Sequence, residues 1–94
     1  MKKSIVNMIK KVATTYCVDF TPLASVEREG KKIYDCIKLE NAILDRSVFI
    51  EEWDNDLLIY NQKLKVERFI WHDSNPTVME KAISLTMALM QLNL

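Results

Sequence analysis

The chain has 94 residues, of which 49% are hydrophobic and 28% are charged, and its formal net charge is zero. This length and composition predict one folded domain over residues 1 to 94 and exclude a disordered chain, which would be poorer in hydrophobic residues. A net charge of zero also argues against a protein that is held on nucleic acid by a general positive field.

Residues 2 to 17 are predicted to form an amphipathic helix. Apolar residues recur along one face at spacings of four, three and four, namely Ile5, Ile9, Val12 and Tyr16. The segment has the charged start of a signal peptide, but Lys10 and Lys11 end its apolar stretch after five residues, which is too short. No stretch is long enough to span a membrane. The sequence therefore predicts a soluble, cytoplasmic protein with no membrane partner.

Residues 22 to 72 are predicted to form a meander of four to five antiparallel strands. Thr21 and Pro22 mark the break after the helix, because the residue before a proline disfavours the helical region. Gly30 separates two strand-like stretches and predicts a tight hairpin turn. Short polar connections between later stretches rich in β-branched and aromatic residues favour antiparallel neighbours. The strand order stays open, and so does a helix over Asp35 to Asp45 as an alternative.

The last twenty residues are predicted to be helical again, with Asn75 as the N-cap and Pro76 as the first helical residue. A core-facing stripe recurs at helical spacing through Val78, Ala82, Leu85, Leu89 and Leu92. A second apolar edge, rich in methionine, exceeds what packing on a small sheet requires. We predict that this edge is a dimer face or a partner groove formed by Ile83, Met87, Met90 and Leu94. The alternative is that the two helices pack against each other and cover this edge.

The order of helix, several strands and helix predicts an α+β fold. We expect a two-layer sandwich in which helices cover one face of an antiparallel sheet. The sequence does not decide whether both helices share that face.

The two cysteines, Cys17 and Cys36, are nineteen positions apart, and no histidine lies near either of them. This spacing matches no metal or redox motif, so we predict buried free thiols. A disulfide between them is the alternative, although so few cysteines seldom form a framework.

The stretch "FIEEWDNDLLIY", residues 49 to 60, places four carboxylates and one tryptophan within six positions. Its central residues, positions 54 to 56, are typical of a hairpin turn. A calcium loop would need a glycine and a closing glutamate that are absent here, and neighbouring strand residues 51 and 52 point to opposite faces. We predict instead a partner-binding site, in which the acids steer a basic protein surface and the tryptophan anchors it. Its residues are Glu51, Glu52, Trp53, Asp54 and Asp56.

No residues are identified as catalytic, cofactor-binding or metal-binding. The single histidine, His72, lies next to Asp73, but no spacing brings a nucleophile such as Cys36 to it. Phosphate-binding loops need several glycines, and the chain has one. The sequence therefore predicts a protein that is not an enzyme and that carries no cofactor.

These observations predict a small noncatalytic protein-interaction module that binds and regulates or inhibits a macromolecular partner. The layout is similar to that of small intracellular chaperones, immunity proteins and phage-encoded inhibitors. This resemblance in size and layout implies binding to another protein's surface and carries over no site residue. The alternative is a small nucleic-acid-binding regulator that uses the basic N-terminal helix, with lysines at positions 2, 3, 10 and 11, together with Lys31 and Lys32 in the first hairpin.

Overall fold

The computed structural model describes residues 1–53, 56–61, 66–70, 78–92 and 94, with the backbone alone for residues 66–70 and 78. The element order is α1 (Lys3–Tyr16), β1 (Asp19–Arg28), β2 (Lys31–Asn41), β3 (Arg46–Trp53), β4 (Asp56–Asn61), β5 (Val66–Ile70) and α2 (Val78–Gln91). The strands form one antiparallel sheet in the order β1-β2-β3-β4-β5. The predicted α+β fold with a meander between two helices is therefore confirmed.

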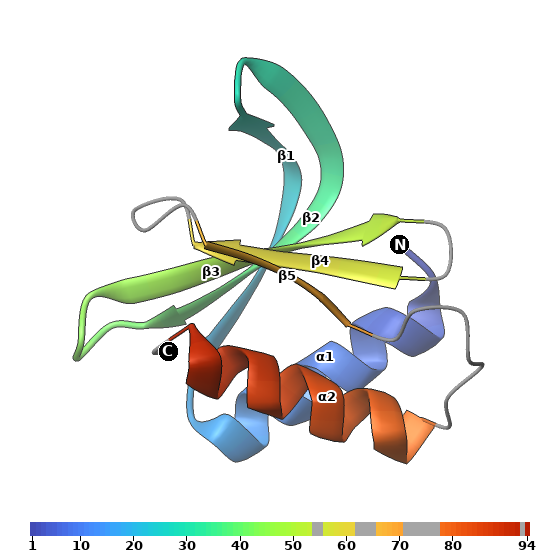
Figure 1. Ribbon diagram of the computed structural model, residues 1–94, viewed down its shortest axis with the longest axis vertical. Coiled ribbons are helices and arrows are strands. Elements are labelled where there is room, and N and C mark those ends of the chain that lie inside the picture. The colour runs from blue at the N-terminus through green and yellow to red at the C-terminus, as the bar shows by residue number, and fades with distance from the viewer. Residues whose placement is uncertain (54–55, 62–65, 71–77, 93) are drawn as a thin grey trace.

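Both helices lie side by side on the same face of the sheet, and the outer end of the β1–β2 hairpin rises on the opposite side (Figure 1). The sequence left open whether the helices share a face. Apolar residues of both helices belong to one core cluster with alternate residues of β2, β3 and β4, so both helices cover the apolar face of the sheet. The described helices include none that is long and apolar enough to cross a membrane.

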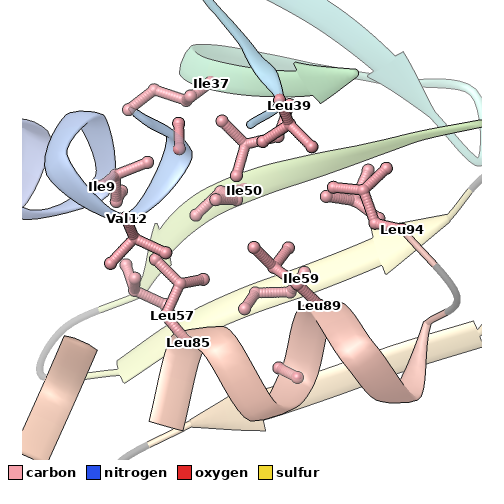
Figure 2. Close-up of a cluster of buried hydrophobic side chains, with 14 of the residues drawn as sticks. Ile9, Val12, Ile37, Leu39, Ile50, Leu57, Ile59, Leu85, Leu89 and Leu94 are labelled. Atoms are coloured by element: carbon pink, nitrogen blue, oxygen red, sulfur yellow. The ribbon is translucent and has the colours of Figure 1, made fainter. Parts of the chain in front are cut away.

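The main core lies between the sheet and the two helices, where side chains from α1, β2, β3, β4 and α2 converge (Figure 2). Alternate strand residues such as Ile37, Leu39 and Ile50 point into it from the sheet. Leu85 and Leu89 of α2 are fully buried, as the predicted core stripe requires. Asn75 and Pro76, the predicted start of this helix, lie outside the described residues.

The end of α1 corrects the predicted position of the first break. The helix ends at Tyr16, and the next residue, Cys17, adopts a left-handed φ of 60° while Val18 N–H donates to the Ala13 carbonyl at 3.0 Å. Pro22 lies inside β1, opposite Ile37, instead of before the first strand. This position is compatible with proline because β1 is an edge strand, which leaves one side of its backbone without a ladder partner.

The β1–β2 hairpin turns at Glu29 and Gly30, which both have positive φ values, 53° and 77°. Two consecutive positive values are typical of the two-residue turns that suit strand twist, so the predicted role of Gly30 is confirmed. Asp35 also has a positive φ, 61°, and the ladder between β1 and β2 omits its pair with Ala24. The part of β2 before Ile37 pairs with β1 alone, because the ladder between β2 and β3 runs only from Ile37 to Asn41. The hairpin is therefore free to curl over the sheet.

The region from Asp35 to Asp45 is strand and turn. β2 continues to Asn41, and a turn follows through Asp45 before β3 begins. The alternative of a helix in this region is therefore wrong. Cross-strand pairing with β1 on one side and β3 on the other overrides the weak helical spacing of the apolar residues.

Candidate functional site

The acidic stretch predicted as a partner site is divided between the two faces of β3. Val48 and Ile50 point to the helices, so Glu51 points to the side of the β1–β2 hairpin. Glu52 points the other way, and its carboxylate accepts a 3.4 Å hydrogen bond from the backbone N–H of Lys2 at the start of α1. A carboxylate at a helix N-terminus interacts favourably with the helix dipole. The expected opposite orientation of the two glutamates is thus observed.

Glu51 forms a buried ion pair with Arg28 from the end of β1. The guanidinium donates from Nε to Oε2 at 2.7 Å and from Nη2 to Oε1 at 3.1 Å. The carboxylate side chain is 2% exposed and that of Arg28 is 17% exposed. Trp53 Nε1 donates a third hydrogen bond to the same carboxylate, at 3.1 Å. A bidentate arginine–carboxylate pair of this kind fixes both the position and the orientation of the two side chains.

Burial of Glu51 raises its pKa, but the hydrogen bonds from Arg28 and Trp53 and the nearby Tyr60 outweigh this effect, and the pKa is lowered overall. The Tyr60 hydroxyl is buried near the carboxylate without making a hydrogen bond of good geometry. Its burial and the neighbouring negative charge both raise the pKa of Tyr60. At neutral pH the group therefore consists of one carboxylate, one guanidinium and one neutral phenol.

Apolar and aromatic side chains surround this ion pair and form a second, smaller cluster under the hairpin. The guanidinium carbon of Arg28 lies over the ring of Tyr60, 5.3 Å from the ring centroid. The Tyr60 ring in turn stacks on Phe49, with the two ring centroids 5.6 Å apart. Cys36 and Leu58 are buried beside them on this face. The arrangement attaches the hairpin to the sheet and encloses the carboxylate, whose side chain is 2% exposed.

Cys17 and Cys36 are both free, which confirms the predicted thiols, but only Cys36 is buried. Cys17, the left-handed residue that follows α1, is exposed. Burial and the nearby carboxylate of Glu51 raise the pKa of the Cys36 thiol to about 11.

We expect one thiol of the native protein to react rapidly with iodoacetamide at pH 8 and the other to react only on unfolding, because Cys36 is buried and protonated. Mass spectrometry of samples taken at successive times measures the rate at which each cysteine is alkylated. The Cys17→Ser variant should lose the rapid phase, and a rapid phase that persists in this variant would contradict the placement of Cys36.

The other residues of the predicted partner site are less enclosed. Trp53 is 47% exposed although its ring nitrogen is engaged by Glu51. Asp56 is half-buried and pairs with Trp53 across the β3–β4 hairpin, and Asp54 lies outside the described residues. Since Glu51 is almost fully buried, it has little surface to offer to a partner. The role of Glu52, Trp53, Asp54 and Asp56 in partner binding stays a prediction.

The part of the chain that the structure describes contains no group of three or more histidine, cysteine, aspartate or glutamate side chains able to hold a metal ion. His72 and Asp73 lie outside the described residues.

A groove of about 750 Å³ runs between α1 and α2 on the outer side of the helical layer. Each helix lines the groove with residues three or four positions apart, which lie on one side of that helix. Its lining consists of Ser4, Asn7, Met8, Lys11, Val12, Thr15, Met79, Ala82, Ile83, Thr86 and Met87. The groove is thus mainly apolar at its base and on its α2 side, with polar and basic residues along α1.

The predicted apolar edge of α2 is exposed over most of its length. Ile83, Met87 and Met90 are 54%, 55% and 61% exposed, and Met79, which precedes the predicted edge on the same helix, is 74% exposed. The two helices do pack together, but this contact does not cover the edge. Leu94 differs from the expectation: it is 5% exposed and belongs to the core, and its carbonyl accepts a hydrogen bond from Asn41 Nδ2 at 3.2 Å. Its backbone N–H donates to the Leu89 carbonyl at 3.0 Å, which holds it against the end of α2.

Sequence reasoning missed Arg28 and Met8. No local pattern connects Arg28 with Glu51, which lies 23 positions further on, although a buried carboxylate requires a cation. Met8 could have been found, since it lies four residues before Val12 on the core face of α1.

The lysines considered for nucleic-acid binding fall into two separate places. Those of α1 lie on the helical layer, whereas Lys31 and Lys32 lie at the start of β2, in the hairpin that rises on the other side of the sheet (Figure 1). The fold therefore does not gather them into one basic surface, and the nucleic-acid role stays a prediction.

Comparison with known proteins finds no relative: no family model, no curated protein and no solved structure matches the chain.

Proposed function

We propose that the chain is a noncatalytic protein-interaction module of the cytoplasm, which binds a protein partner through the α1–α2 groove and thereby regulates or inhibits it. The observation that carries this proposal is the row of exposed apolar side chains on α2, Met79, Ile83, Met87 and Met90, beside an open groove. Contiguous exposed apolar surface beside a concave lining is typical of protein-binding sites. Methionine suits such a surface because its flexible thioether adapts to a partner.

The free thiols of Cys17 and Cys36 are compatible with the reducing cytoplasm that the proposal assumes. The acidic stretch contributes to the scaffold through Glu51, which holds the hairpin. Trp53 is exposed enough to add a second contact. The groove remains the primary surface of the proposal because its apolar side chains have no partner within the described part of the chain that covers them.

The test compares two isoleucine-to-lysine variants. Ile83 lines the groove, and Ile43, which is 95% exposed, lies in the β2–β3 turn. A partner is captured from the native cell by crosslinking and purified, and its affinity for each variant is measured. We expect Ile83→Lys to weaken binding by about tenfold or more and Ile43→Lys to change it by less than about twofold.

Circular dichroism and a urea titration first establish that both variants are folded. Partner affinities that are equal for wild type and Ile83→Lys would contradict the proposed surface. If Ile83→Lys proves unstable, Met87→Lys provides a second variant, since Met87 is 55% exposed and lines the same groove.

A further inference from the structure

Among the described residues that line the groove between α1 and α2, the charge lies on the α1 side. The sequence of α1, "KSIVNMIKKVATTY", contains three lysines and no acidic residue. Lys11 lines the groove, and Lys10 lies beside it on the exposed surface of the same helix. The described α2 side of the groove consists of four apolar residues, Met79, Ala82, Ile83 and Met87, and of Thr86, whose hydroxyl donates to the Ala82 carbonyl at 2.9 Å. A partner that fits must therefore present an apolar surface with negative charge along one flank.

The dimensions of the groove suit a short helix. Its lining extends from Ser4 to Thr15 on α1 and from Met79 to Met87 on α2. At about 1.5 Å rise per residue these spans correspond to roughly 16 Å and 12 Å, or two to three helical turns. Both walls are α-helices, whose backbone groups are already paired, so the groove offers no ladder to an extended strand. Apolar side chains at helical spacing on an incoming helix would fill it.

We infer that the groove binds an amphipathic α-helix of another protein, whose apolar face covers Ile83 and Met87 and whose acidic flank faces Lys10 and Lys11. This inference rests on the proposed function and names the partner class. The acidic flank selects the orientation of the helix, since the opposite direction would place its acids over the apolar ridge of α2.

A second copy of this chain fits the groove poorly. Its two helices offer a single acidic residue, Glu80, which is followed by Lys81. The helical layer of another copy therefore offers Lys10 and Lys11 no acidic flank to face them. An anionic membrane supplies negative charge, but it requires a convex apolar face that can enter the lipid surface, whereas this surface is hollow between the helices.

The inference is tested with the full chain labelled with ¹⁵N and three synthetic helical peptides of about 18 residues, a length at which a helix can persist. All three carry the same leucine stripe, and one flank carries glutamate, glutamine or lysine. Affinities and binding sites are read from amide chemical shifts at low salt. We expect the glutamate peptide to bind about tenfold more tightly than the lysine peptide, with shifts along α1 and α2. The double variant Lys10→Glu/Lys11→Glu should reverse this order.

Equal affinities for the three peptides would overturn the acidic partner and leave the groove as a general protein-binding surface. Two results would assign the groove to another occupant and overturn the inference as well. These are self-association by light scattering that Ile83→Lys abolishes, and binding to phosphatidylserine vesicles without binding to any peptide. If no peptide binds while capture of a cellular partner still depends on Ile83, the helical partner is wrong and the proposed function stands.

Discussion

Replacement of Arg28 by methionine is expected to lower the free energy of unfolding by about 4 kcal/mol, because it leaves the buried Glu51 carboxylate without its cation. Replacement of Glu51 by leucine should cost less, about 2 kcal/mol, since the side chain of Arg28 is 17% exposed and can turn to water. Urea titrations followed by circular dichroism measure both values. The double variant Arg28→Met/Glu51→Leu should recover most of the lost stability, because an apolar pair of similar size leaves no buried charge that needs a partner.

The Arg28–Glu51 pair also predicts that the stability of the wild type and that of Arg28→Met change in opposite directions as the pH falls. In the wild type the pKa of Glu51 is lowered, so its stabilising contribution is present above pH 4.5, the ordinary value, and is lost as the pH falls further. In Arg28→Met, burial without a cation should raise the pKa of Glu51 above that value. This variant should then gain stability as the pH falls from 7 to 5. If its stability does not change over this interval, Glu51 is not buried as the structure places it.

Replacement of Leu89 by alanine is expected to lower the free energy of unfolding by about 3 kcal/mol. Leu89 is fully buried at the centre of the contact between α2 and the sheet, where a truncated side chain leaves a cavity (Figure 2). Its matched control is Met87→Ala on the same helix, which should change stability by less than about 0.5 kcal/mol because Met87 is 55% exposed.

Urea titration of the two variants tests how α2 is oriented. The reverse order of effects would mean that the methionine edge faces the sheet, and the α1–α2 groove would not exist in this form. A small effect of both substitutions would mean that α2 contributes little to the core. The expected order would support the exposed edge on which partner binding depends.

Much of the fold could be predicted from local patterns. The spacing of Ile5, Ile9 and Val12 defined the core face of α1, and that of Leu85 and Leu89 defined the core face of α2. Gly30 located the first hairpin because a tight turn requires positive φ. Such patterns are reliable because they act over a few residues, within one element.

Predictions failed where a partner strand or a distant side chain decided the outcome. Pro22 was expected to precede the first strand, but the edge position of β1 tolerates it. Leu94 was expected on an exposed face, but it lies in the core, where its backbone N–H donates to the Leu89 carbonyl. In both cases the local signal was correct for an isolated segment and was overridden by packing.

The acidic stretch illustrates the same division. Its residue types indicated a charged surface, and the alternation along β3 correctly separated Glu51 from Glu52. Nothing in the stretch itself indicated that Glu51 is 2% exposed. Only the curling of the β1–β2 hairpin beyond Asp35 brings Arg28 over it. A carboxylate that looked available to a partner is thus part of the protein's own structure.

The sequence by itself determined the order of the helices and the strand meander and which face of the two helices is apolar, because hydrophobic spacing and turn chemistry are local properties. The tertiary structure decided which apolar surface remains exposed and which charges are paired. Both depend on residues that are distant in the chain, such as Arg28 and Glu51, or α1 and α2 on one face of the sheet. The methionine edge was visible in the sequence. That it borders an open groove follows only from how the two helices pack.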